Sequence, residues 1–144
     1  MPFIKIWIHA VWSTKNREPL LDKVIRKAVI DHIQFNAKDK NIYIDTMNGY
    51  VDHLHALISL KGDQTPAKVM QLIKGESAYW INQERLIGTK FAWQSEYFAI
   101  SVSESQLPIV RKYIDNQEEH HSKKSFQQEY EEFMEKYRFD KFSG

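Results

Sequence analysis

The order of the predicted secondary-structure elements is the feature that most constrains how this chain can fold. Residues 3–14 alternate in character and are rich in β-branched and aromatic side chains, which predicts a strand. Residues 20–38 carry apolar side chains at helical spacing. Two further strands are predicted over 41–49 and 51–60, with Asn48-Gly49 as the turn between them.

The remainder of the chain predicts a second helix, a fourth strand and a helical end. Thr65 is a predicted N-cap with Pro66 at the first helical position, and this helix extends to about Leu86. A strand is expected over 97–103, followed from Ser105 by two helices that are broken near Ser122. The order β-α-β-β-α-β predicts an α+β, ferredoxin-like fold, in which an antiparallel sheet has its helices on one face and a C-terminal helical extension follows.

Chain length and composition limit the possible classes of protein. A chain of 144 residues favours one domain, with residues 1–104 as the ferredoxin-like core and residues 105–144 as the helical extension. Cysteine does not occur, which excludes disulfides, a thiolate metal site and a cysteine nucleophile. Neither a signal-peptide pattern nor an apolar run of roughly 18 residues is visible, so we expect a cytoplasmic protein.

The charge balance does not by itself favour a nucleic-acid partner. The formal net charge is +1, from 20 basic and 19 acidic residues, whereas phosphate binding usually leaves a basic surface. Basic side chains can still gather on one face while the acidic stretch at 129–132 supplies the balance elsewhere. The candidate phosphate contacts are Lys15, Arg17 and Lys74.

Two histidines on the third predicted strand form the first candidate site. His53 and His55 are two residues apart, so strand alternation places both side chains on one face and Leu54 on the other. Two adjacent imidazoles can bind one divalent metal ion. They can equally lie on a polar sheet face without a ligand, and the His-x-His pattern alone leaves both interpretations open.

A tyrosine and a glutamine in the C-terminal region form the second candidate site. Tyr113 and Gln117 are four residues apart, which places them on one face of a helix. Tyrosine can act as a nucleophile, and the glutamine oxygen suits a hard cation such as Mg²⁺ or Mn²⁺. Because the ordinary pKa of tyrosine is about 10, a metal ion at the attacked phosphate would assist it. Simple packing of Tyr113 is the competing interpretation.

The other histidines have ordinary structural explanations. His9 is expected to be a structural or hydrogen-bonded residue of the first strand, and His32 a surface residue of the first helix. His120 and His121 follow Gln117 by three and four residues, so His121 can share its face. A solvated helix end is the favoured interpretation of this pair.

Taken together, these segments resemble the single-tyrosine HUH transposases of the insertion-sequence 200/605 type. The resemblance spans nearly the whole chain, because its short motifs occur in one order. They are His9-Ala-Val-Trp-Ser-Thr-Lys-Asn-Arg17, Asp52-His-Leu-His55, Leu72-Ile-Lys-Gly75, Trp93-Gln-Ser-Glu-Tyr-Phe98 and Tyr113-Ile-Asp-Asn-Gln117.

The resemblance implies a role for each candidate residue. His53, His55 and Gln117 match the ligands of a divalent metal ion (Mg²⁺ or Mn²⁺), and Tyr113 matches the nucleophile. The family cleaves and rejoins single-stranded DNA near hairpins at the ends of the mobile element, through a 5′-phosphotyrosine intermediate. The resemblance also implies a homodimer in which the tyrosine helix of one subunit can complete the site of the other.

Two alternatives differ in chemistry from the transposase interpretation. One is a non-mobilising, domesticated protein of the same fold that binds single-stranded DNA. The other is a metal-dependent phosphodiesterase in which water is the nucleophile and Tyr113 is structural. A protein that only binds nucleic acid has no need for the two histidines, the tyrosine and the glutamine together.

Overall fold

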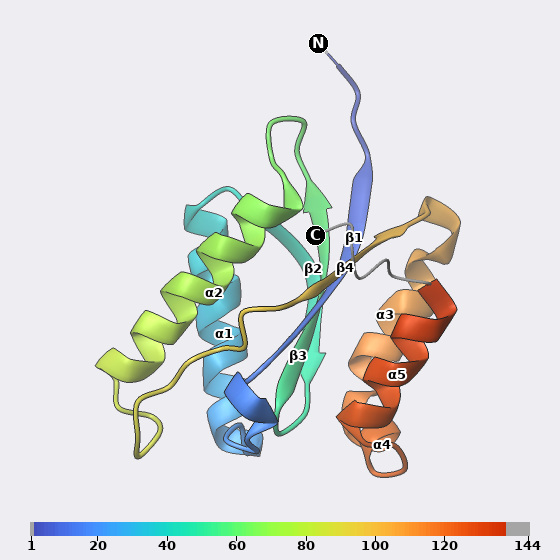
Figure 1. Cartoon of the computed structure of the whole chain (residues 1–144). Coiled ribbons are helices and arrows are strands. Elements are labelled where there is room, and N and C mark those ends of the chain that lie inside the picture. The colour runs from blue at the N-terminus through green and yellow to red at the C-terminus, as the bar shows by residue number, and fades with distance from the viewer. Residues whose placement is uncertain (1, 138–144) are drawn as a thin grey trace.

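The computed structural model describes residues 2–137 and contains a four-stranded antiparallel sheet with the strand order β2-β3-β1-β4 (Figure 1). The strands are β1 (Ile6–Ser13), β2 (Tyr43–Gly49), β3 (His53–Leu60) and β4 (Phe98–Val102). β1 pairs with β3 on one side and with β4 on the other. This order, with a helix after β1 and another after β3, confirms the predicted ferredoxin-like α+β fold.

The sheet is covered on both faces. Helices α1 (Lys23–Asp39) and α2 (Pro66–Gln83) lie on one face, and α3 (Leu107–Asp115), α4 (Gln117–His121) and α5 (Phe126–Tyr137) lie on the other (Figure 1). The predicted C-terminal extension therefore forms a third layer. Within residues 2–137, no helix combines the length and apolar character that a membrane span requires.

Strand alternation divides the sheet between two different interiors. Ile8, Ala10 and Trp12 of β1 point into the main hydrophobic core, which contains Leu54 and lies under α1 and α2. Trp7 and Val11 point to the opposite face, where smaller apolar clusters meet α3 and α5. Burial on both faces explains why β1 and β3 are apolar over most of their length.

The helix starts follow capping chemistry. Thr65 caps α2, because its hydroxyl oxygen accepts a hydrogen bond from the Lys68 backbone N–H at 3.1 Å, as predicted. α1 begins three residues later than predicted because Asp22 caps it, accepting from the Ile25 N–H at 2.9 Å. Leu21, just before this cap, is fully buried in the main core.

The predicted Asn48-Gly49 turn is wrong. Both residues belong to β2, where they pair with His55 and Leu54, and the chain reverses over residues 50–52. Gly49 is required by a close approach rather than by a turn, because a Cβ there would lie 2.2 Å from the His53 carbonyl oxygen. This glycine allows the β2–β3 connection to pass directly beside the histidine strand.

The C-terminal helices are broken near Ser122, as predicted, and also at Asn116. Asn116, with φ −98° and ψ 23°, separates α3 from α4. Tyr113 and Gln117 therefore do not share one continuous helix: Tyr113 lies in α3, and Gln117 is the first residue of α4. The Gln117 side-chain amide donates to the Tyr113 carbonyl oxygen at 3.1 Å, so the two residues remain coupled across the break.

Gly75 generates a stability prediction, because it lies exposed in the middle of α2 and a Cβ there would meet nothing within 4 Å. Gly75→Ala should raise the free energy of unfolding by about 1 kcal/mol, since alanine restricts the unfolded chain and favours the helix. Urea denaturation followed by circular dichroism measures it. The matched change Gly49→Ala should lower stability, and an unchanged or lower stability for Gly75→Ala would contradict the account.

Candidate active site

His53 and His55 lie side by side on β3 and face the C-terminal helices. Both side chains are fully buried, and their ring centroids are 5.1 Å apart. Leu54, between them, points into the main core on the opposite face, as strand alternation predicts. The histidine pair is therefore fixed by the backbone of a central strand.

The Nδ1 atoms of this pair are both occupied by hydrogen-bond partners. His53 Nδ1 is 2.7 Å from Asp52 Oδ1, and His55 Nδ1 is 2.9 Å from His9 Nε2. These contacts direct both Nε2 atoms toward the space between the sheet and α5. Metal-binding histidines usually hydrogen-bond through one ring nitrogen, which leaves the other nitrogen facing the ion. His53 and His55 have this arrangement, with Nδ1 hydrogen-bonded and Nε2 facing the site.

Tyr113 and Gln117 reach the same space from α3 and α4. The Tyr113 ring centroid is 5.6 Å from that of His55 and 6.0 Å from that of His9. Gln117 is fully buried, and its Oε1 atom has no hydrogen-bond partner in the part of the chain that the structure describes. All four residues that the sequence singled out therefore converge on one place.

Two residues that the sequence did not single out occupy the centre of this site. Glu129 of α5 is 1% exposed, and its carboxylate lies 3.2 Å from His55 Nε2 and 3.6 Å from His53 Nε2. His121 of α4 places its Nε2 atom 3.4 Å from the same carboxylate. The Tyr113 hydroxyl donates a hydrogen bond to Glu129 as well. The sequence placed the acidic stretch at 129–132 away from the site, and this is wrong for Glu129. It also favoured a solvated helix end for His120-His121, and this is wrong for His121, which is buried.

The environment holds these groups in defined protonation states. Burial lowers the pKa of His55 to about 3 and that of His9 to about 4, so both imidazoles are neutral at pH 7. Burial, reinforced by the charge of Glu129, raises the pKa of Tyr113, so its hydroxyl keeps its proton. For Glu129, burial acts to raise the pKa, but the close imidazoles of His121 and His55 outweigh burial and lower the pKa of this carboxyl.

Five buried polar atoms at this centre have no hydrogen-bond partner within residues 2–137. Such atoms are rare in proteins, and each requires an explanation. The side-chain atoms that could bind metal at His53, His55, His121 and Glu129 all lie within 4.8 Å of one another. The donor set therefore fits a divalent cation. The five unpartnered atoms are His53 Nε2, His55 Nε2, His121 Nε2, Gln117 Oε1 and Glu129 Oε1.

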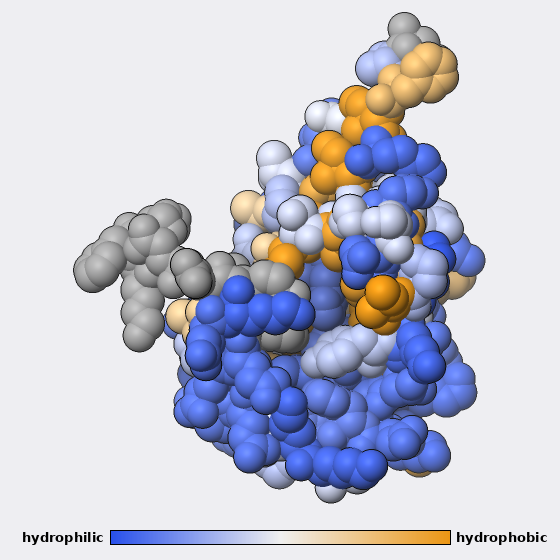
Figure 2. Space-filling view, turned by 90° about the vertical axis from the view of Figure 1, so that its right-hand side faces the viewer, coloured by the Kyte–Doolittle hydropathy of each residue, from blue (hydrophilic) through white to orange (hydrophobic). Residues whose placement is uncertain are grey.

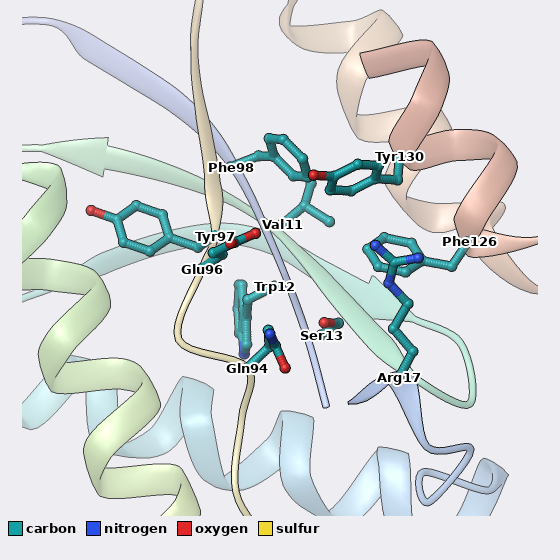
Figure 3. Close-up of a pocket in the computed structure, with 10 residues that line it drawn as sticks. All are labelled: Val11, Trp12, Ser13, Arg17, Gln94, Glu96, Tyr97, Phe98, Phe126 and Tyr130. Atoms are coloured by element: carbon teal, nitrogen blue, oxygen red, sulfur yellow. The ribbon is translucent and has the colours of Figure 1, made fainter. Parts of the chain in front are cut away.

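α5 is anchored beside the histidines by aromatic contacts. The Phe126 ring stacks on His53 with centroids 4.3 Å apart, and the Arg17 guanidinium lies 5.2 Å from the centre of the Phe126 ring (Figure 3). Arg17 also lies 4.7 Å from the centre of the Tyr130 ring, and Phe98 of β4 meets Tyr130 edge-on. These contacts place Glu129, which lies between Phe126 and Tyr130 in the sequence, against the metal-capable cluster.

Two of the three predicted phosphate contacts have other partners in this chain. Lys74 donates to the carbonyl oxygens of Gln94 and Ser95 at 2.7 and 3.1 Å, and burial lowers its pKa. Arg17 is engaged with α5, as described above, and Lys15 is exposed. None of these three side chains lines a hollow at Tyr113.

A different group of lysines surrounds the tyrosine. Tyr113 lines a hollow of about 460 Å³ together with Lys112, Lys123 and Lys124. The outer surface over the C-terminal helices is largely hydrophilic (Figure 2). Ile109 of α3, which is 63% exposed, is an apolar residue in the lining of this hollow. Three lysines and one acidic residue, Glu119, therefore line this hollow, so its basic side chains outnumber its acidic ones.

Comparison with known families decides the class of protein. The sequence profile described as IS200-like transposase matches residues 3–117, most of the chain. This protein belongs to the IS200-like transposase family. The ISDra2 transposase TnpA of Deinococcus radiodurans is 28% identical to it over 115 residues, which are 76% of this chain and 81% of the relative.

Solved structures support the same fold for this IS200-like transposase. A crystal structure assigned to a transposase of Deinococcus radiodurans R1 superposes with a TM-score of 0.66 at 21% identity, covering 81% of this chain and 93% of that one. A REP-associated tyrosine transposase bound to a REP hairpin gives a TM-score of 0.61 at 18% identity, covering 81% and 68%.

The anchoring of α5 generates a prediction for this transposase. Arg17→Ala removes the cation–π contacts to Phe126 and Tyr130, which are worth about 1 kcal/mol. Amide hydrogens of residues 126–137 should then exchange about fivefold faster, while amides of the sheet stay unchanged. Hydrogen exchange measured by mass spectrometry tests this. Lys15→Ala, whose side chain is exposed, is the matched control, and equal protection in both variants would contradict the anchoring role.

Proposed function

We propose that this transposase cleaves and rejoins single-stranded DNA with Tyr113 as the nucleophile and a divalent metal ion held by His53, His55 and Gln117. The observation that carries the proposal is the position of the Tyr113 hydroxyl. It reaches a buried centre where imidazole nitrogens and the Gln117 oxygen lack hydrogen-bond partners, in a chain of the IS200-like family.

The chemistry is a transesterification at phosphorus. The Tyr113 oxygen forms a bond to the scissile phosphorus, the bond from phosphorus to the 3′-oxygen breaks, and a 5′-phosphotyrosine and a free 3′-hydroxyl result. The phenolic proton leaves Tyr113, and the departing 3′-oxygen gains one. Attack of a 3′-hydroxyl on the phosphotyrosine reverses the step, so rejoining needs no external energy source.

The side chains of this chain supply orientation and proton handling. Glu129 accepts the hydrogen bond from the Tyr113 hydroxyl and thereby holds the proton that must leave. Gln117 binds the Tyr113 carbonyl oxygen, which ties the helix of the nucleophile to the metal-capable cluster. When bound, Mg²⁺ or Mn²⁺ would neutralise charge on the scissile phosphate.

α3 is held to β2 by several polar contacts, which fix the position of Tyr113. The Arg111 guanidinium pairs with Asp45 at 2.6 Å, and Asp115 accepts a hydrogen bond from Thr46 at 2.8 Å. Such a rigid setting favours catalysis that depends on placing the nucleophile in line with a phosphate.

The DNA path is inferred from the lysines beside the nucleophile. Lys112 and Lys123 line the hollow at Tyr113 and can pair with backbone phosphates, whereas Lys124 of the same lining pairs with Glu132 at 2.7 Å. Lys15, Arg17 and Lys74 stay predicted contacts at a distance from this hollow. A hairpin substrate is supported by the REP-associated relative, whose solved structure contains a REP hairpin.

The homodimer that the family resemblance implies stays a prediction. Within the single chain, Tyr113 already lies beside its own His55. The division at residues 104 and 105 into a core and a helical extension is likewise part of the proposal.

The proposal predicts a covalent protein–DNA adduct that depends on Tyr113. Purified protein with Mn²⁺ and labelled single-stranded oligonucleotides from the DNA flanking its gene should give a denaturant-resistant band in the wild type, and Tyr113→Phe should abolish it. Tyr43→Phe, at an exposed tyrosine on β2, is the matched control. Cleavage without an adduct in both the wild type and Tyr113→Phe would indicate the water-dependent phosphodiesterase. DNA binding without cleavage would indicate a domesticated DNA-binding protein.

A further inference from the structure

His121 and Glu129 bring two additional ligand atoms to the centre that the HUH pattern does not include. We propose that both are ligands of the same metal ion as His53 and His55, so that α4 and α5 complete the metal site. This inference rests on the proposed function, because it assumes that the histidine pair on β3 binds a metal ion.

The hydrogen bonding of His121 fixes which nitrogen can bind a metal. Its Nδ1 atom lies 2.6 Å from the Lys124 carbonyl oxygen, and a carbonyl can only accept a hydrogen bond. Nδ1 therefore carries a proton, and Nε2 is the nitrogen whose lone pair can bind a metal ion. His53 is held in the same way, because its Nδ1 atom faces the carboxylate of Asp52 at 2.7 Å.

These lone pairs face an anion. The Nε2 atoms of His53 and His121 lie 3.6 and 3.4 Å from oxygens of Glu129, in a place where all three side chains are 1% exposed or less. A lone pair facing a carboxylate without an intervening positive charge is unfavourable in a dry interior. A shared cation converts this repulsion into coordination by all of these groups.

The spacing of the atoms agrees with one shared ion. Ligands that each lie about 2.0–2.2 Å from one ion are separated from one another by up to about 4.4 Å. The four ligand atoms of His53, His55, His121 and Glu129 lie within 4.8 Å of one another, so a movement of a few tenths of an ångström at most would bring all four to one ion. His120 also approaches Glu129, at 3.0 Å, but it does not belong to this group and its side chain is 23% exposed.

The positions of the two additional ligands are built into the fold. The His121 ring stacks on Tyr50 of the β2–β3 connection with centroids 5.4 Å apart, and Glu118 of the same helix pairs with the buried Arg26 at 2.6 Å. Glu129 is held through its neighbours Phe126 and Tyr130, which dock α5 on His53 and Arg17. Both residues therefore reach the centre from anchored elements rather than from a free surface.

A consequence concerns the nucleophile. Glu129 receives the hydrogen bond of the Tyr113 hydroxyl through the same carboxylate that would bind the ion. Glu129 thus links the metal site to the nucleophile, and α5 carries a residue that positions Tyr113 as well as the ion.

Isothermal titration of the full chain with MnCl₂ tests the ligand assignment. Glu129→Gln and His121→Ala should each weaken Mn²⁺ binding at least about tenfold, since even residues that only support a ligand change metal affinity by about 10- to 100-fold. The matched controls Glu131→Gln, at an exposed position of α5, and His32→Ala, at a histidine paired with Glu76 on the other face of the sheet, should bind as the wild type does. Circular dichroism establishes that each variant is folded.

The outcomes separate this inference from the proposed function. If His53→Ala loses Mn²⁺ affinity while Glu129→Gln and His121→Ala bind as the wild type does, the additional ligands are wrong and the histidine-pair site stands. If His53→Ala also binds as the wild type does, the proposed metal site itself fails.

A second measurement on the wild-type protein avoids any effect of substitution on folding. On titration with Zn²⁺, long-range ¹⁵N–¹H NMR should show the Nε2 resonances of His53, His55 and His121 shifting together, with the ring of His32, which pairs with Glu76 on the other face of the sheet, as internal control. An unchanged His121 Nε2 resonance, alongside shifts of the other two, would overturn the proposal.

Discussion

The burial of several imidazoles against one carboxylate, between a β-sheet and the helices that cover it, is the constraint on which the rest of this structure depends. Glu129 is 1% exposed, and His53 and His55 are fully buried. An ionised group in such a place must be paired, because its removal from water is costly. The covering helices can pack closely here only if the buried charges are balanced by protons or by a cation.

This constraint explains why one face of the sheet is covered by a hydrophobic core and the other by a polar site. The face under α1 and α2 is a continuous hydrophobic core to which Leu54 contributes. The other face contains only small apolar clusters and the polar site. Alternation along β3 assigns Leu54 to the first face and the two histidines to the second, so the same strand serves stability and chemistry. Even with the carboxylate in place, the Nε2 atoms of His53, His55 and His121 have no hydrogen-bond partner among the residues that the structure describes.

The sequence was sufficient for the parts of the structure that depend on local chemistry. The periodicity of apolar residues, the Thr65 cap and the strand order predicted the fold, and the spacing of His53 and His55 predicted their shared face. The predicted turn at Asn48-Gly49 is wrong. A glycine is needed at position 49 because the His53 carbonyl oxygen lies too close for a Cβ, and this contact is visible only in the folded chain. His121 had a signal, its spacing of four from Gln117. Glu129 had none, since its role depends on how α5 folds back onto β3.

The central claim is that the buried polar cluster is a metal centre, and anomalous X-ray scattering from a crystal grown with Mn²⁺ tests it most directly. The account predicts a single strong anomalous peak enclosed by the Nε2 atoms of His53, His55 and His121 and the carboxylate of Glu129. A manganese peak elsewhere in the molecule, with no anomalous scattering between β3 and α5, would contradict it.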